Sequence, residues 1–315
     1  GYEMSKLLYA LLALSYTTCA LAEEETVAKY AASIPEYYVS SDSEGFVTNK
    51  YKASAYGIYK NPDNYTGIQI QHNQFRQNNW DSSAQQYGLV TKAVDTRTGL
   101  GYNLNVGYNL QNGYKLLTTD SNYSLKLTNT TQAEFLLFRD RVETQNSLTN
   151  GIYYTMAGVS IEQKIIDRLS VVVFGGNLYF SDTNTRPTIK AKIIYDLVPD
   201  YGITGQIRYR QFRNTNTGVT NNYFNPNTYS ESMLALGLRK RINNWMVNGV
   251  AGVGQQSVDS GPHTTTQLYE LALTSPPVTA NNMHIRAKAG YSESASFGGP
   301  NYSHRYFMGE LIFPF

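Results

Sequence analysis

The amino-acid sequence predicts a transmembrane antiparallel β-barrel of about sixteen strands, with about fourteen as the alternative. Segments of roughly 9–14 residues alternate apolar and polar side chains, and turns rich in Gly, Asn, Asp and Pro separate them. Beyond the N-terminus, no apolar run reaches the roughly 18 residues that a membrane-spanning helix needs. Lipid offers no hydrogen-bond partner to the backbone, so strands cross a bilayer only when they close into a barrel.

Residues 1–22 have the pattern of an export signal, with a short extension before its methionine. Lys6 precedes the apolar run LLYALLALSYTTCALA, and its final Ala-Leu-Ala predicts cleavage after Ala22. We therefore expect residues 23–33 to form a short periplasmic segment and residues 34–315 to form the barrel. The expected location is the outer membrane of a Gram-negative bacterium.

Cys19 is the only cysteine of the chain and lies within this signal. Acylation of Cys19 is an alternative use of the signal, but Tyr16 stands where lipoprotein signals carry an aliphatic residue. Cleavage after Ala22 leaves a mature chain without cysteine, which excludes disulfides and thiolate chemistry.

Three segments show the alternation most clearly. GLGYNLNVGYNL (99–110) places Leu and Tyr on one face and Asn on the opposite face, while TIKAKIIYDL (188–197) and MHIRAKAGY (283–291) oppose apolar to charged residues. This period of two is that of a strand and fits a helix poorly. By the same criterion we expect strands near 34–41, 46–59, 65–77, 84–94, 99–110, 115–128, 131–144, 152–163, 169–180, 188–197, 203–213, 229–242, 245–257, 264–274, 282–293 and 303–315.

The connections between these segments tend to alternate in length. Short ones fall at 164–168, 199–202 and 243–244, and longer polar ones at 181–187, 214–227 and 294–301. Outer-membrane barrels with an even strand number keep both termini in the periplasm and have short inner turns and longer outer loops. The sequence therefore places the longer connections on the cell surface.

A soluble β-sandwich is the alternative fold, because its strands alternate too. The export signal, the absence of cysteine from the mature chain and strands of about 11 residues favour the barrel, since sandwich strands have five or six. Aromatic residues near strand ends resemble the interfacial girdles of membrane barrels: Tyr153, Phe180, Tyr195, Tyr209, Trp245 and Tyr291.

The chain ends in the strand-patterned segment YFMGELIFPF. A terminal Phe with apolar residues two and four positions earlier resembles the C-terminal signal that the barrel-assembly machinery reads. We expect Pro314 to lie beyond the last inter-strand bond, because it has no N–H to donate. On the closing strand, Met308 and Glu310 are expected to face the lumen, and the residues expected to face lipid and form the assembly signal are Phe307, Leu311, Phe313 and Phe315.

A barrel of sixteen strands encloses more space than side chains fill, so we expect a conduit. The residues opposite the apolar faces form a polar wall of mixed sign, which indicates a hydrophilic cargo rather than a fatty acid. Mere pairing across strands is the alternative role for each of them. The lumen candidates from alternation are Lys190, Lys192, Arg208, Arg210, Glu231, Arg239, Arg241, His284, Arg286, Lys288 and Glu310.

Enzymatic and nucleic-acid functions find little support in the sequence. Ser257, Asp259, Ser260 and His263 lie close together, but their turn-forming stretch is better explained as a polar loop. No metal-ligand spacing or phosphate loop is present, so we expect no cofactor, no metal and no catalytic residue. A net charge of +2 gives no reason to expect nucleic acid as a partner.

Several stretches resemble the barrel domains of outer-membrane exopolysaccharide secretion porins, the exporters of poly-N-acetylglucosamine and cellulose. These are PEYYVSSDSEGF (35–46), FRDRVET (138–144) and YFNPNTYSESMLALGLRKRINNWMVNGVAGVGQQ (223–256). The resemblance implies passive guidance of a sugar polymer through the lumen. It also implies cargo contacts near the outer rim by Arg139, Arg141 and Glu143.

Members of that family carry a long periplasmic helical-repeat region before the barrel. Only about a dozen residues of the expected mature chain precede the first expected strand. A separate periplasmic helical-repeat protein is therefore an expected partner, besides outer-membrane lipid and the polysaccharide. A general diffusion porin remains the alternative function. A surface receptor or adhesin is a further alternative, because a related barrel serves in phage attachment.

Overall fold

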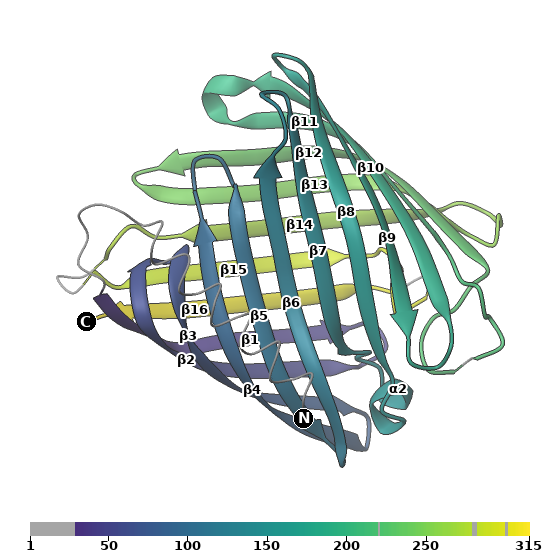
Figure 1. Ribbon diagram of the computed structural model, residues 1–315. Coiled ribbons are helices and arrows are strands. Elements are labelled where there is room, and N and C mark those ends of the chain that lie inside the picture. The colour runs from purple at the N-terminus through teal and green to yellow at the C-terminus, as the bar shows by residue number, and fades with distance from the viewer. Residues whose placement is uncertain (1–28, 220, 279–281, 300–301) are drawn as a thin grey trace.

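The computed structural model describes residues 29–219, 221–278, 282–299 and 302–315. They form sixteen antiparallel strands, each hydrogen-bonded to its neighbours in the chain, and β1 pairs with β16 to close the barrel (Figure 1). The predicted barrel of sixteen strands is confirmed, and the alternative of fourteen is wrong. The predicted export signal and Cys19 lie outside the described residues.

The elements have the following bounds. The strands are β1 (Lys29–Asp42), β2 (Val47–Asn61), β3 (Asn64–Gln77), β4 (Trp80–Val94), β5 (Gly101–Gln111), β6 (Tyr114–Lys126), β7 (Thr131–Arg141), β8 (Tyr153–Ile166), β9 (Leu169–Phe180), β10 (Thr185–Val198), β11 (Ile203–Arg213), β12 (Thr228–Ile242), β13 (Trp245–Val258), β14 (Thr264–Thr274), β15 (His284–Ser292) and β16 (His304–Pro314). The helical pieces are α2 (Gln145–Thr149) and the 3-10 turn η1 (Pro199–Tyr201). No helix in the described part of the chain is long and apolar enough to cross a membrane, a finding that concerns helices alone.

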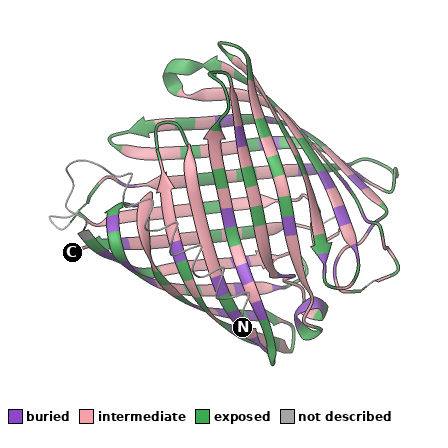
Figure 2. Ribbon diagram, in the orientation of Figure 1, coloured by how far each residue is buried: buried purple, intermediate pink, exposed green. Residues whose placement is uncertain are grey.

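Exposure alternates along the strands as the sequence pattern predicts. In β12, Leu234 is 64% exposed while its neighbour Met233 is 3% exposed, so one face looks outward and the next looks into the barrel. Exposed and covered bands follow one another along the outer surface in Figure 2. Ile68, Phe135 and Ile207 belong to the exposed apolar face of their strands. Such an apolar outer surface is stable only against lipid, because in water it would form one large hydrophobic patch.

Two hairpins show why their connections are short. Asn112 and Gly113 have φ values of 49° and 79°, and Asn243 and Asn244 have 51° and 67°. Two successive positive φ values define the tight turn that suits the twist of paired strands, and Asn and Gly adopt them most readily. The strand end at which β1 begins and β16 ends is called the periplasmic end here, and the opposite end is the outer end.

The predicted division into short inner and long outer connections holds only in part. The outer turn at 112–113 is tight, whereas the periplasmic connections 95–100 and 275–283 are longer. The predicted outer loop 181–187 is shorter than expected, because β10 begins at Thr185. At the start of the barrel, β1 begins at Lys29, before the predicted position 34.

The closing pair of strands extends to the last residue. Phe315 N–H donates to the Tyr30 carbonyl at 2.7 Å, and Tyr30 N–H donates to the Phe315 carbonyl at 3.1 Å. The expectation that Pro314 lies beyond the last inter-strand bond is therefore wrong: its register position faces Ala31, and Phe315 bonds beyond it. Pro314 is tolerated because the N–H that donates to the Tyr30 carbonyl belongs to the next residue, Phe315.

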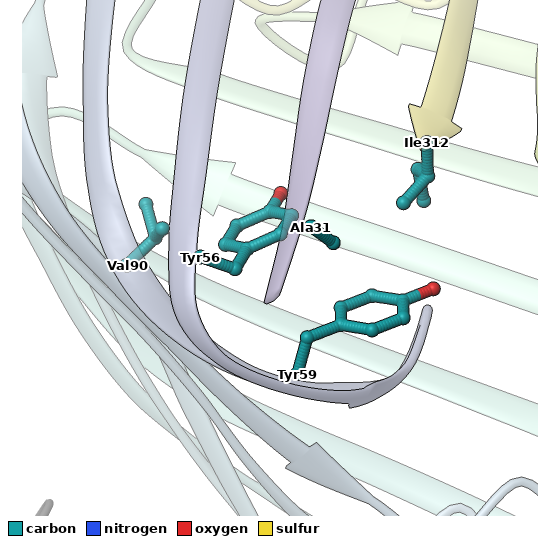
Figure 3. Close-up of a cluster of buried hydrophobic side chains, with 5 residues drawn as sticks. All are labelled: Ala31, Tyr56, Tyr59, Val90 and Ile312. Atoms are coloured by element: carbon teal, nitrogen blue, oxygen red, sulfur yellow. The ribbon is translucent and has the colours of Figure 1, made fainter. Parts of the chain in front are cut away.

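Inside the barrel, a small apolar cluster covers this closing seam at the periplasmic end. Ala31, Tyr56, Tyr59, Val90 and Ile312 are all buried and come from β1, β2, β4 and β16 (Figure 3). The seam is thus packed from the lumen side, while Phe313 and Phe315 are exposed on the outside.

Candidate functional site: a polar lumen closed by outer loops

The lumen wall of β10 and β11 carries four cationic side chains. The strand register places Lys190 directly opposite Arg210 and Lys192 directly opposite Arg208. Their neighbours Ile189 and Ile207 are exposed on the outer face, so the cations point into the barrel. We call Lys190, Lys192, Arg208 and Arg210 the basic patch.

Two acidic residues lie beside these cations and are used in ion pairs. Arg210 Nη2 is 3.6 Å from Glu231 Oε2, and Lys288 Nζ is 4.0 Å from Glu270 Oε2. For Lys192 and Arg208 the described part of the chain offers no ion pair or hydrogen bond. The predicted lumen residues of β10, β11, β12 and β15 are therefore brought together, but not as fully neutralised pairs.

Three adjoining cavities run along this wall from the periplasmic end. The first, of about 660 Å³, is lined by Arg239, Arg241 and Asn248 among others. The second, of about 300 Å³, shares Arg239 and Asn248 with it. A third, of about 420 Å³, shares Glu270 with the second and is lined by the whole basic patch. The shared residues make the cavities neighbours, so a polar path follows the wall upward.

The path ends beneath a group of outer loops that fold together. We call residues 142–152, 221–227 and 293–299 the outer cap. Ser294 of the cap lines the third cavity. Tyr223 of the cap stacks on Phe180 of β9 with ring centroids 4.2 Å apart, and Phe297 packs against both rings. Val142 is fully buried in the same cluster. These apolar contacts join all three cap segments to one another at the outer end.

Arg186 is the polar centre of the cap. It is 2% exposed, and its guanidinium donates to the Phe224 carbonyl at 2.6 Å, the Ser296 carbonyl at 2.9 Å and Asn214 Oδ1 at 2.9 Å. The guanidinium carbon also lies 4.3 Å from the centroid of the Phe212 ring. A single strand residue thus ties two cap segments to the barrel wall by charge-assisted hydrogen bonds.

Sequence reasoning missed both Arg186 and Phe180 as functional residues. Arg186 falls in the stretch predicted as a loop, and Phe180 was predicted as part of an interfacial girdle, whereas it is 5% exposed and faces inward. One local signal was present in the sequence. An alternating strand that includes Lys190 and Thr188 also includes Arg186 on the same face.

The wall holds the cap segment 293–299 at further points. Arg210 donates to the Ala295 carbonyl, and the Ala295 N–H donates to the Tyr229 hydroxyl at 3.3 Å. Gln256 Nε2 donates to the Glu293 carbonyl at 3.2 Å. Arg210 therefore belongs both to the basic patch and to the attachment of the cap.

Glu143 attaches the first cap segment across the mouth of the barrel. Its carboxylate is 2.5 Å from Lys50 Nζ on β2, a strand that is far from β7 in the sheet order. Leu148 of α2 is buried between Phe46 and Phe75 at the β1–β4 side. This segment consequently crosses the mouth instead of extending outward.

Arg139 and Arg141 lie at the outer end of β7, near the rim where the sequence analysis placed them. By alternation they share the strand face of Phe135 and Leu137, which are exposed, but Arg141 is 5% exposed and its Nε donates to the buried Asn109 Oδ1 at 2.5 Å. A cargo contact by either residue stays a prediction. Arg139 Nε donates to the Leu117 carbonyl at 3.0 Å, and Arg141 Nη2 donates to the Tyr114 carbonyl at 2.9 Å. The backbone pairing of β6 with β7 ends at Arg139. Beyond this point the two guanidinium groups bond to carbonyls of β6 in place of backbone hydrogen bonds between the strands.

At the periplasmic end the lumen candidates form hydrogen bonds to other residues of the barrel. Arg239 Nη2 donates to the Thr96 carbonyl at 2.9 Å, Arg241 Nη1 to the Asn244 carbonyl at 3.5 Å, and His284 Nδ1 is 3.1 Å from the Ser275 carbonyl. Ser33 Oγ donates to Glu310 at 2.7 Å. Arg239 thus meets the connection 95–100, which comes from far around the barrel.

Asp63 is a charge centre that the sequence analysis did not single out. Its Oδ1 is 2.6 Å from Arg286 Nη2 and 3.0 Å from Lys92 Nζ, which joins three separate parts of the wall. Burial by itself raises the pKa of Asp63, but the charges of Arg286 and Lys92 outweigh burial and lower the pKa below its ordinary value.

We expect Asp63→Asn to lower the free energy of unfolding by about 2 kcal/mol at neutral pH, because a charged hydrogen-bonded group is lost. Because folding lowers the pKa of Asp63, its contribution to the free energy of unfolding is complete above the pKa that Asp63 has in the unfolded chain. That contribution is lost as pH falls through the pKa of Asp63 in the folded protein. Urea unfolding in detergent at neutral and acidic pH measures both effects. Asp167→Asn, the same change at an exposed turn, is the control and should alter neither value. Equal acid sensitivity of the wild type and Asp63→Asn would contradict the assignment.

Residues 257–263 form loop contacts. Ser257 Oγ donates to the Gly261 carbonyl at 2.9 Å, and Asp259 Oδ1 accepts the Thr228 N–H at 2.9 Å. Among the described residues, neither side chain forms a hydrogen bond to His263. Within the described ranges, no three His, Cys, Asp or Glu residues are grouped as metal ligands.

The class of protein follows from these features. A closed barrel with an apolar exterior, a polar lumen and an outer cap is an outer-membrane β-barrel, which agrees with the predicted location in a Gram-negative outer membrane. No family model and no curated protein matches the sequence.

Among solved structures, the chain is similar to one described as a bacterial polysaccharide outer membrane secretin. The TM-score is 0.62 at 12% identity, over 92% of this chain and 100% of that chain. OprD from Pseudomonas aeruginosa gives 0.42 at 9% identity, over 91% and 94% of the two chains. OccAB1 from Acinetobacter baumannii gives 0.45 at 7% identity, over 91% and 96%. The first similarity supports the fold.

Proposed function

We propose that this protein is an outer-membrane pore that passively conducts a hydrophilic polymer, an exported exopolysaccharide, and that the outer cap closes the pore at rest. The observation that carries the proposal is the row of polar cavities that leads from the periplasmic mouth to the underside of the cap. Asn, Gln, Arg and Lys donors along this path suit the hydroxyl groups of a sugar chain. Many weak contacts also suit translocation, because one tight site would hold the chain.

The sequence resemblance to exopolysaccharide secretion porins and the similarity in fold to a polysaccharide secretin point in the same direction. In this proposal a separate periplasmic helical-repeat protein delivers the polymer, and the barrel-assembly machinery inserts the barrel through its C-terminal strand.

Deletion of the gene is expected to remove polymer from the cell surface while its cytoplasmic synthesis continues. Sugar analysis of the surface and cytoplasmic fractions measures both quantities, and a plasmid copy of the gene should restore secretion. Normal secretion in the deletion strain would contradict the export function.

A general diffusion porin is the second candidate function. The cap segment 142–152 favours it, because a loop that crosses the mouth and pairs Glu143 with Lys50 also narrows an open pore. Planar-bilayer recordings of the wild-type protein separate the two candidates. Large and steadily open steps are expected of a diffusion porin, and rare or blocked steps are expected of a capped exporter.

A further inference from the structure

We propose that the cargo is an anionic, carboxylate-bearing polysaccharide, and that the basic patch is the surface that guides it. This inference rests on the proposed export function and names the class of polymer that the lumen accepts. The arrangement of charge along the cavity path supports it.

The basic patch contains two pairs of like charges in direct register. Lys190 faces Arg210 and Lys192 faces Arg208 on adjacent strands. Like charges directly opposite one another in a sheet are destabilising, whereas opposite charges stabilise. Because the empty wall bears this repulsion, an anion that binds between the strands would relieve it.

The cavity is lined by four cations and by three carboxylates, Glu134, Glu231 and Glu270, so a net positive charge remains among its lining residues. Glu231 pairs with Arg210 and Glu270 with Lys288. The cavity also includes Glu134, which accepts a hydrogen bond from Ser124 Oγ at 3.3 Å. Glu162 of β8 is a further carboxylate whose charge acts on Lys192. Against Glu134 and Glu162 stand three cations of the basic patch that have no ion pair among the described residues.

The basic patch lies on the cavity path that the cargo is proposed to follow. All four cations line the third cavity, which lies between the periplasmic cavities and Ser294 of the outer cap. Arg239 and Arg241 line the first cavity, so a polymer meets cationic groups at the entrance as well. A positively charged amino sugar would be repelled along this route, whereas a carboxylate would be attracted.

An aromatic ring beside the cations fits a sugar acid. The Lys190 ammonium lies 5.3 Å from the centroid of the Phe174 ring, and Phe174 lines the same cavity. An aromatic face offers an apolar surface to a pyranose ring, while the adjacent ammonium and guanidinium groups bind its carboxylate. The combination favours a sugar acid over a simple inorganic anion.

The test is a binding measurement with the full purified protein in detergent. Oligogalacturonate, neutral N-acetylglucosamine oligomers and cationic glucosamine oligomers of equal length are titrated by calorimetry. We expect oligogalacturonate to bind most tightly and to weaken as salt is raised. Combined substitution of Lys190→Gln, Lys192→Gln and Arg208→Gln should weaken this binding about tenfold or more.

The matched control removes the same charge from exposed positions outside the lumen: Arg76→Gln, Lys115→Gln and Arg213→Gln. It should bind as the wild type does, and heat-modified gel mobility verifies that both variants are folded. Absence of oligogalacturonate binding, a preference for neutral or cationic oligomers, or equal binding by the two triple variants would each overturn the inference.

Failure of this inference differs from failure of the export function. Normal polymer secretion by the deletion strain contradicts export and leaves the binding result unchanged. Loss of secretion together with a preference for neutral or cationic oligomers supports export and contradicts the anionic cargo.

Discussion

If the outer cap closes the pore at rest, as proposed, Arg186→Ala is expected to leave the pore open for most of a planar-bilayer recording. The substitution removes donors to Phe224, Ser296 and Asn214 and leaves the aromatic rings of the cap around a cavity. Hydrogen bonds to charged groups contribute roughly 1.5–3 kcal/mol each. A net loss of even about 3 kcal/mol shifts the equilibrium between closed and open cap roughly a hundredfold.

Two further variants make this result specific. Arg186→Lys keeps the charge but loses the planar fork, so it should give an intermediate open probability. Arg213→Ala, an exposed position at the outer end of β11, should conduct as the wild type does. Sensitivity of cells to a large antibiotic measures the same opening in the intact outer membrane. Unchanged conductance and unchanged sensitivity in Arg186→Ala would show that the cap does not close the pore.

The barrel was predictable from sequence because its signal is local. Each strand repeats with a period of two, and side-chain orientation follows from counting along that strand. The same counting places Lys190 and Arg208 in the lumen. It also places Arg139 on the face of Phe135 and Leu137, which are exposed. The cargo role of Arg139 came from the family resemblance alone and stays a prediction.

The outer cap was not predictable in the same way. Its contacts join Phe180, Tyr223 and Phe297, which are widely separated in the chain. A loop sequence carries no period that reports what it packs against, and turn-forming residues are compatible with both extended and folded-in loops. The hydrogen bonds of Arg186 require that two cap segments meet over β10. This meeting depends on the closed barrel as a whole, so no single segment of the sequence reveals it.

The second large effect is expected at the C-terminus. Phe315→Ala should lower the amount of protein in the outer membrane several-fold, while the purified chain still refolds in detergent. In the folded barrel the Phe315 ring is 74% exposed and lies 6.2 Å from the Tyr30 ring, so its packing contributes little to the finished structure. The backbone bonds between Phe315 and Tyr30 remain in this variant. A large loss would therefore arise during assembly, as expected if the terminal aromatic is recognised before the barrel closes.

Two comparisons separate recognition from stability. Deletion of Phe315 also removes the backbone bonds to Tyr30, so it should impair refolding in detergent as well as insertion in cells. Phe135→Ala removes an aromatic ring that is 49% exposed to lipid in mid-barrel, and it should leave the outer-membrane level near that of the wild type. Immunoblots of membrane fractions and gel mobility after refolding measure the two quantities. Equal outer-membrane levels of Phe315→Ala and Phe135→Ala would contradict a special role for the terminal residue, because the two changes remove the same ring from the lipid-facing surface.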